Sequence, residues 1–301
     1  MKNKTCGTIS GITASVALLA LPLHAQITGD LTTTGVSYGN PLAIQNVNTA
    51  FGASTGAGTG DDYNGSELDA AYGTVSGGDL YLFLSGDVQG GTSQNSLQIF
   101  IGGSGSTVGQ STLNTSVSPI SNMNGSTFAA MNATLAFSIN DYNGTLYSDA
   151  ANLQGSGGGY LGSVALSGGI GSGTPGGGSY SLPGFEEAFN NTHVSTMGTG
   201  GTALSGATSG ANTTTGIELL IPLADLGTIS GNIDVVADIN NGGVNYLSNQ
   251  LLPGLGSTAG NLGTTTFSDV GNFVVPVPEP SILALLSLFG MGSLYIFRRR
   301  K

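Results

Sequence analysis

The hydrophobic residues between positions 26 and 276 occur in short runs, which glycine, asparagine, serine and threonine separate. The clearest run is Leu80–Leu84, which lies between the turn-forming pairs Gly78-Asp79 and Ser85-Gly86. Short apolar runs between such residues are typical of β-strands. The pattern predicts strands at 70–75, 80–84, 97–101, 133–139, 145–147, 217–221 and 233–237, with weaker candidates at 264–267 and 272–275.

Turns and short helices are predicted between some of these runs. Asn143-Gly144 is a strong signal for a two-residue hairpin turn, since both residue types tolerate a positive φ. Ser76–Asp79 is expected to join the first two strands in a second hairpin. Helix is expected only at Phe128–Asn132 and at Pro222–Leu226, where proline opens the turn and Gly227 ends it.

Many short strands with little helix predict an all-β fold, and specifically an antiparallel β-sandwich of jelly-roll-like character. Long glycine-rich loops are expected at 155–178 and 196–215, with an edge strand at 160–166 inside the first. Strands of the same character continue on both sides of these loops, which favours one domain over 26–275. A domain of that size can bury a stable core without disulfides.

The N-terminus has the pattern of a secretory signal peptide. Lys2 and Lys4 form a positive start, an apolar stretch covers Ile12–Leu23, and the small residue Ala25 precedes Gln26. We therefore expect residues 1–25 to be removed by cleavage between Ala25 and Gln26. Cys6, the single cysteine of the chain, leaves with this segment, so the mature protein has no thiol chemistry.

The C-terminus combines three features in a fixed order. The motif Pro278-Glu279-Pro280 comes first, an apolar run over 282–297 follows, and the cluster Arg298–Arg300 with Lys301 ends the chain. The apolar run predicts a short transmembrane helix, and the basic end is expected to stay cytoplasmic. This arrangement resembles the PEP-CTERM sorting signal of Gram-negative bacteria, with the match carried by Pro278, Glu279, Pro280, Arg298, Arg299 and Arg300.

The resemblance implies a partner and a location. In that family an exosortase, which is a membrane protease-transpeptidase, removes the tail over 276–301. The chain is then expected to pass the secretion translocon and to be held in the inner membrane with its body in the periplasm. After processing, it is expected at the cell surface or in the extracellular matrix.

The body carries two further resemblances. Ser66–Gly73, Asp79–Leu84 and Leu97–Ile101 resemble a recurrent set of PEP-CTERM surface proteins without an assigned activity. The stretch Ile217–Gly227 resembles the closing strand and turn of family 9 carbohydrate-binding-type β-sandwiches. The second resemblance implies the same fold class and a polysaccharide ligand.

The charge distribution excludes several functions. No lysine or arginine lies between Thr5 and Phe297. Of the 17 acidic residues only Glu279 lies beyond position 276, which leaves 16 acids in the body without a fixed cation. Nucleic-acid binding needs such cations and is excluded. The acids must be solvated, capped by backbone N–H groups or paired with a metal ion.

Most enzyme classes are also excluded, because the mature chain has no cysteine, lysine or arginine and has His193 as its only histidine. A zinc site of the usual type, a cysteine–histidine pair and a phosphate-binding lysine cannot be built. We therefore predict that the protein is not an enzyme. A glycoside hydrolase with two carboxylates stays open as a remote alternative.

Calcium is the one cofactor that the acidic turns suggest, since Ca²⁺ prefers carboxylate, amide and carbonyl oxygens. Two turns combine such oxygens with a glycine, although neither completes an EF-hand loop. Solvated loop acids that keep the protein soluble are the alternative interpretation. The candidate ligands are Asp61, Asp62, Glu67, Asp69, Asp238 and Asn240.

A structural or adhesive role is the leading expectation, and a carbohydrate-binding module for exopolysaccharide is the alternative. Such a module would place aromatic rings together on one sheet face. Tyr38, Tyr160 and Tyr180 lie beside loop residues, and the proposed platform consists of Tyr63, Tyr142 and Tyr246.

Overall fold

The computed structural model describes residues 24–45, 51, 66–103, 106–192, 213–229, 231–255 and 260–278. These residues form an all-β protein of antiparallel sheets without an α-helix, so the predicted fold class is confirmed at that level. None of the helical turns in the described ranges is long and apolar enough to cross a bilayer. The helix predicted at 282–297 lies outside the described residues.

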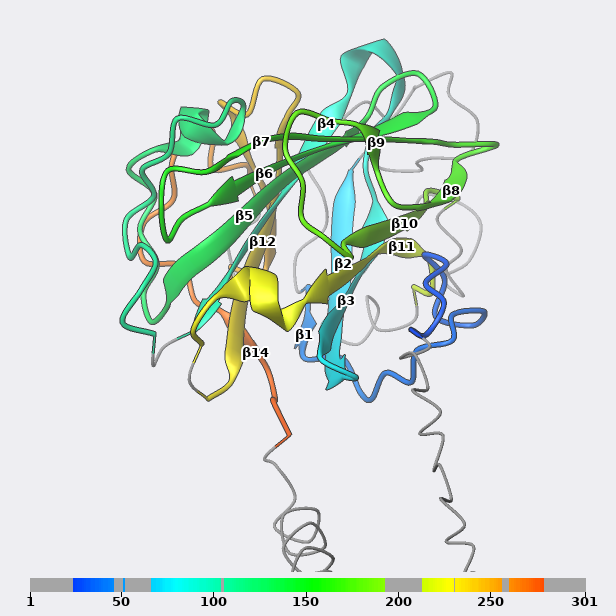
Figure 1. The fold of residues 1–301 in the computed structure, drawn as a ribbon. Helices are drawn as coiled ribbons and strands as arrows, with labels where there is room; N and C mark the ends of the chain where they lie inside the picture. The colour runs from blue at the N-terminus through cyan, green and yellow to red at the C-terminus, as the bar shows by residue number, and fades with distance from the viewer. Residues whose placement is uncertain are drawn as a thin grey trace, which may run out of the picture.

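Two sheets make up the fold, and all strand pairs within them are antiparallel (Figure 1). The first sheet has six strands, in the order β1 (Ala43–Ile44), β2 (Glu67–Ser76), β3 (Asp79–Asp87), β11 (Gly216–Pro222), β10 (Glu186–Asn190) and β8 (Ile170–Gly173).

The second sheet has eight strands. Its order is β13 (Leu247–Leu252), β12 (Ile233–Asn241), β4 (Asn95–Gly103), β5 (Asn132–Asp141), β6 (Thr145–Asn152), β7 (Gly158–Ala165) and β9 (Gly176–Gly177), and β14 (Phe273–Val275) pairs with the first half of β12. Only Thr174 and Pro175 separate β8 from β9, so the chain passes directly from one sheet to the other at this edge.

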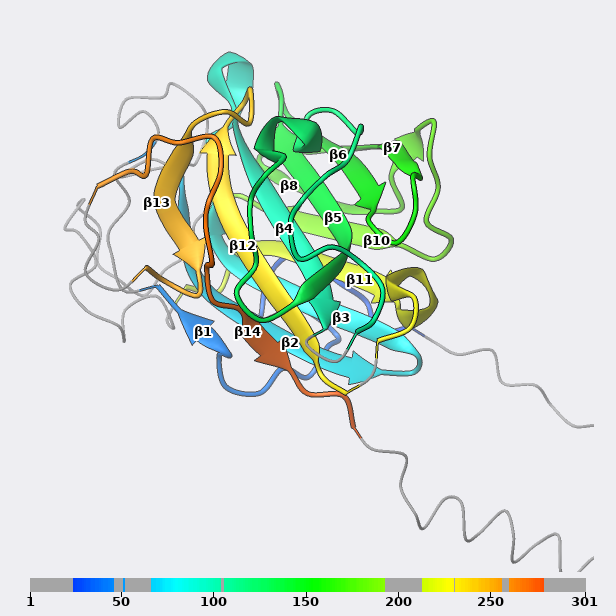
Figure 2. The ribbon, with the colours of Figure 1, turned by 90° about the vertical axis from the view of Figure 1, so that its left-hand side faces the viewer.

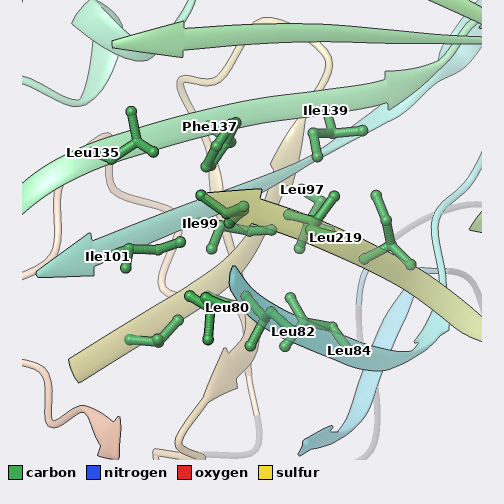
Figure 3. Close-up of a cluster of buried hydrophobic side chains, with 14 of the residues drawn as sticks. Leu80, Leu82, Leu84, Leu97, Ile99, Ile101, Leu135, Phe137, Ile139 and Leu219 are labelled. Atoms are coloured by element: carbon green, nitrogen blue, oxygen red, sulfur yellow. The ribbon is translucent and has the colours of Figure 1, made fainter. Parts of the chain in front are cut away.

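The two sheets share one apolar core, which makes the arrangement sandwich-like. Alternate residues of β3, such as Leu80, Leu82 and Leu84, point at alternate residues of β4 and β5, such as Ile99 and Phe137 (Figure 3). The period of two follows from strand geometry, which sends successive side chains to opposite faces. All five of these side chains are at most 1% exposed. Their burial supplies the main stabilising free energy of the fold.

A second apolar core lies on the opposite face of the eight-stranded sheet. The segment between β4 and β5, which includes the 3₁₀ turn η2 (Ile120–Met123), and the segment after β13 lie in front of the strands in Figure 2. Phe128 and Phe267 from these segments contact Phe100 of β4 with ring centroids 5.2 and 5.6 Å apart. The layer packs on Phe100 and on the sheet residues around it. It therefore covers only part of this face of the sheet.

Most predicted strands are confirmed, and so is the hairpin at Asn143-Gly144, where φ is +51° and +75°. The short helix after Pro222 is the 3₁₀ turn η4 (Leu223–Leu226). The helix predicted at Phe128–Asn132 is wrong, because Phe128 lies in the second core and Asn132 begins β5. The strand expected at 264–267 is absent, since these residues form a bend over that core.

The glycine-rich region 155–178 is not the loop that its composition predicts. It contains β7, β8 and β9, and β7 lies between β6 and β9 rather than at an edge. The sequence pattern also missed β10 and β13. The loop predicted at 196–215 lies outside the described residues except for 213–215.

The first and last described segments leave the molecule at the same end. His24 lies 3.6 Å from Asp79, which opens β3 beside the Gly77-Gly78 turn. Val275 contacts Gly73 of β2, and its partner Ile233 opens β12. We call this the tail end. By register, the β5–β6 turn, η1 (Gly91–Ser93) and the β12–β13 turn lie at the opposite, distal end.

The segment after the predicted cleavage site covers the outer face of the six-stranded sheet. Ala25 is half-buried and its N–H donates to the Tyr81 hydroxyl at 3.2 Å, whereas Gln26 is exposed. Ile27 is buried against Tyr81 and Leu220. Packing onto the sheet therefore begins at Ala25, just before the predicted cleavage site, and continues with Ile27 just after it.

Glu218 of β11 fixes this segment through hydrogen bonds. Its carboxylate is fully buried and accepts hydrogen bonds from the N–H groups of Thr28 and Gly29 at 2.8 and 3.0 Å. It also accepts them from the hydroxyls of Thr34 and Tyr38 at 2.6 and 3.1 Å. Four donors replace the water that the buried charge has lost, which is the condition for burying a carboxylate at modest cost.

Replacing Glu218 with alanine should lower the free energy of unfolding by at least about 3 kcal/mol, because four donors lose a charged acceptor. Urea unfolding followed by circular dichroism measures the change. Glu186→Ala, a half-exposed acid on the neighbouring strand, is the matched control and should change stability by less than about 0.5 kcal/mol. Equal effects of the two variants would contradict the anchoring role.

Candidate functional site

Three tyrosines lie side by side on the outer face of the eight-stranded sheet. Tyr147 of β6 and Tyr160 of β7 have ring centroids 6.2 Å apart and nearly parallel planes. Tyr142, in the β5–β6 turn, lies 6.5 Å from Tyr147 and is 41% exposed. We call these residues the tyrosine row. Rings in such a row present apolar faces that can stack on the apolar faces of sugar rings.

The strand register explains why these side chains share a face. Leu146 and Ala150 of β6 point into the inner core, so Tyr147 and Asp149 between them point outward. Asp149 pairs directly with Tyr160 across the β6–β7 ladder, despite a bulge next to it. The row runs from the β5–β6 turn at the distal end onto the part of the sheet that the outer layer leaves open.

Polar groups accompany the rings. Asp149 is half-buried, and this burial raises its pKa to about 6. Asn140 of β5 pairs directly with Tyr147. Aromatic rings next to an amide and a carboxylate combine stacking with hydrogen bonding, which is the donor and acceptor pattern that sugar hydroxyls require.

A groove runs along the nearby edge, between β7 and η4. It consists of two adjoining cavities of about 230 and 410 Å³, which share Tyr180, Ser181 and Leu182. We call it the Tyr180 groove. The first cavity is closed by residues such as Leu161 and Phe185 of the inner core. The second is lined by the polar side chains of Asn152, Gln154 and Asp225.

Two features characterise the polar half of the groove, which is the second cavity. Oδ2 of Asp225 is buried and has no hydrogen-bond partner among the described residues, and burial raises the pKa of this carboxyl. The Gln154 amide lies over Gly227, where an added Cβ would be 1.8 Å from Gln154 Oε1 and where φ is +70°. Glycine is therefore required at this position for the amide to line the groove.

The tyrosine row and the Tyr180 groove are joined through β7. The N–H of Tyr180 donates to the carbonyl of Tyr160 at 2.9 Å. Gly159, the residue before Tyr160, has its α-carbon against Tyr180, since an added Cβ would lie 3.6 Å from the Tyr180 Cβ. One strand therefore places a ring on the sheet face and a second ring at the sheet edge.

The two described members of the predicted sugar platform have different aromatic neighbours. Tyr142 belongs to the tyrosine row, but Tyr246 stacks on Phe51 with a centroid distance of 5.9 Å. Tyr63 lies outside the described residues. Sequence reasoning missed Tyr147. The signal was available, since the hairpin at Asn143-Gly144 sets a register that puts Tyr147 and Asp149 on one face.

The candidate metal ligands are divided between the two sheets. Glu67 and Asp69 are buried on β2, whereas Asp238 and Asn240 are buried on β12. Asp61 and Asp62 lie outside the described residues. Within the ranges that the structure covers, no three acidic, histidine or cysteine side chains gather in a way that could hold a metal ion.

Asn240 and Asp238 have different environments. The Asn240 side-chain oxygen accepts hydrogen bonds from the N–H groups of Tyr246 and Asn241 at 2.8 and 3.0 Å and so closes the β12–β13 turn. Asp238 is fully buried opposite Gln98, and neither of its carboxyl oxygens accepts a hydrogen bond from a described residue. Desolvation raises its pKa well above the ordinary value, which favours the protonated acid.

Glu187 of β10 is a second buried acid, and it lies between the two sheets. Its Oε2 accepts a hydrogen bond from the Ser148 hydroxyl of β6 at 2.5 Å. Burial nevertheless raises the pKa of Glu187 to about 8. Sequence reasoning allowed solvation, backbone capping or a metal for such acids. Glu218 is capped as expected, whereas burial favours the protonated, uncharged forms of Glu187 and Asp238.

The sorting and cleavage residues contribute no site among the described residues. Pro278 is exposed at the tail end, and Glu279, Pro280 and Arg298–Arg300 lie outside the described residues. The carbonyl of Gln26 accepts hydrogen bonds from the Gly35 N–H and the Thr34 hydroxyl at 2.8 and 3.1 Å.

No family model, curated protein or solved structure matches the chain.

The raised pKa of Glu187 predicts that the free energy of unfolding depends on pH. Between the ordinary carboxyl pKa of 4.5 and about 8, the folded state keeps a proton that the unfolded chain has released. Stability from this group is therefore complete below 4.5 and falls by roughly 1.4 kcal/mol per pH unit until about 8. Glu187→Gln should reduce this slope and be more stable than the natural protein at pH 8, as urea unfolding at pH 5 and 8 would measure. Glu186→Gln is the control, and an unchanged slope in Glu187→Gln would refute the assignment.

Proposed function

We propose that the chain is an exported surface or matrix protein that attaches to exopolysaccharide through a β-sandwich body of jelly-roll-like character. In this proposal the signal peptide, residues 1–25, directs the chain to the secretion translocon. An exosortase then removes the tail over 276–301. The helix at 282–297 holds the protein in the inner membrane until that step.

The position of the chain ends supports this order of segments. Packing onto the six-stranded sheet begins at Ala25 and Ile27, next to the proposed signal cleavage. At the other end, β14 finishes at Val275, and Val277 still contacts the inner core. The motif that begins at Pro278 therefore follows immediately after the last packed residues, where an exosortase could reach it.

The observation that carries the adhesive role is the tyrosine row. Three neighbouring rings, two of them stacked across the β6–β7 pair, lie beside Asp149 and Asn140 and offer a stacking surface for a polymer. Cross-strand aromatic pairs also stabilise sheets. Grouped rings next to polar side chains are, in addition, typical of recognition surfaces.

The direction of the row fits attachment at the cell surface. Both chain ends leave at the tail end, whereas the row starts at the distal end with Tyr142. A processed protein attached through its new C-terminus would therefore turn the start of the row away from the attachment point. Polysaccharide in the surrounding matrix would meet this end first.

Replacing Tyr147 and Tyr160 with alanine should weaken co-sedimentation of the purified protein with exopolysaccharide by about tenfold, since the loss of two stacking rings corresponds to roughly 1.4 kcal/mol. The control is Tyr246→Ala, which removes an exposed tyrosine that stacks on Phe51 and is not part of the row. Thermal unfolding of each variant checks the fold. Unchanged binding by a folded double variant would exclude the row as the glycan site.

Replacing Glu279 with alanine should block removal of the tail, because the exosortase would lose the acidic residue of its recognition motif. The unprocessed protein should then stay in the inner-membrane fraction, where immunoblotting shows it at a higher mass. Glu186→Ala, an acid outside the motif, should be processed normally. Normal processing and release of the Glu279 variant would refute the exosortase assignment.

A further inference from the structure

The Tyr180 groove has a chemical feature that the tyrosine row lacks. Asp225 is half-buried and lines the second cavity. Its Oδ2 is buried and receives no hydrogen bond from any described residue, so a ligand in the groove can reach this carboxyl only through Oδ1. A half-buried carboxylate with so few partners is costly, and a cationic ligand group at Oδ1 would stabilise it.

We infer that the Tyr180 groove binds a protonated amino sugar of a polysaccharide, with the ammonium group at Asp225 and the sugar ring against Tyr180. This inference rests on the proposed function, and it names the class of glycan that the protein prefers. Asp225 would form an ion pair with the ligand, and Asn152, Gln154 and Ser181 would hydrogen-bond its hydroxyl groups.

The need for an external cation follows from the composition. The described residues contain no lysine or arginine, and their one histidine, His24, lies beside Asp79 and precedes the proposed cleavage site. No side chain of the mature body can therefore supply a fixed positive charge to Asp225. An ammonium group on the ligand provides both the missing donor and the missing charge.

The remaining lining favours a sugar over a simple amine. Tyr180 offers a ring, and three neutral polar side chains surround it in the second cavity. This cavity, of about 410 Å³, falls in the size range of small-ligand sites. The first cavity adjoins it and shares Tyr180, so neighbouring units of one polymer can occupy both.

The negative charge of the body also favours a cationic ligand. The body carries 16 acids, which repel anionic polysaccharides and attract cationic ones over distances of about a Debye length. This long-range attraction alone does not distinguish one acid from another. A specific site at Asp225 makes a further prediction, which is that the preference for a cationic glycan depends on this one residue.

The test compares two oligomers that differ only in the charged group. Isothermal titration measures the binding of the purified full chain to an oligomer of glucosamine and to the same oligomer in N-acetylated form. The natural protein should bind the glucosamine oligomer at least tenfold more tightly. Asp225→Asn should abolish this preference, and Tyr180→Ala should weaken the binding of both oligomers.

Asp269→Asn is the matched control, since it removes an equal charge at an exposed position outside the groove. It should keep the preference. Equal affinity of the natural protein for the two oligomers would overturn the inference. So would a preference that survives in Asp225→Asn, or one that is lost equally in Asp269→Asn, which would indicate general electrostatic attraction.

The outcomes separate this inference from the proposed function. If exopolysaccharide binding requires the tyrosine row but the groove variants bind as the natural protein does, the proposed function stands and the groove assignment is wrong. If the protein binds neither exopolysaccharide nor either oligomer, both are wrong. Loss of the oligomer preference in Asp225→Asn together with row-dependent binding supports both.

Discussion

The absence of positive charge in the body is the constraint on which the rest of the structure depends. Every acid must be stabilised without an internal ion pair to lysine or arginine. Glu218 is stabilised by four hydrogen bonds, which also attach the first segment of the domain to its sheet. Burial instead raises the pKa of Glu187 and Asp238, which favours their protonated forms. Asp225, in the Tyr180 groove, has no donor to its buried oxygen among the described residues.

The strand β7 has a central role in relating the two candidate sites. It lies near the edge of the eight-stranded sheet, so one of its residues, Tyr160, can face the open sheet surface while its backbone carbonyl holds Tyr180 at the edge. Its glycines permit this close approach. Gly158 is in contact with Ala150 and Val117, and a Cβ there would lie 2.5 Å from the Ala150 carbonyl. Gly158 and Gly162 of this strand therefore serve close packing against neighbouring backbone.

The fold was predictable where apolar alternation decides the outcome. Leu80–Leu84 and Leu97–Ile101 are strands because their alternate side chains fill the inner core. The prediction failed where polar residues are buried or where a segment packs on a sheet. β13 was missed because Ser248, Asn249 and Gln250 are polar yet buried. Phe128 lies in an outer layer that no local pattern encodes.

The candidate sites were less accessible to sequence reasoning than the strands. Tyr142 was identified because it lies in a recognisable turn, but its neighbours in the row follow from strand register across three strands. The Tyr180 groove depends on contacts between β7, the turn before β10 and η4, which are far apart in the sequence. A linear pattern has no means of placing Asp225 near Asn152.

The antiparallel pairing of β14 with β12 has a mechanical consequence for a protein that is held at its C-terminus. If polymer is bound at the distal end and the tail end is fixed, tension runs along β14 rather than across it. The paired residues Phe273–Val275 then bear the load together in shear, and the buried side chains of Phe273 and Val275 resist sliding with them. A strand pulled in this direction must break all its pairs at once, so the short β14 can serve as a clamp under flow or drag.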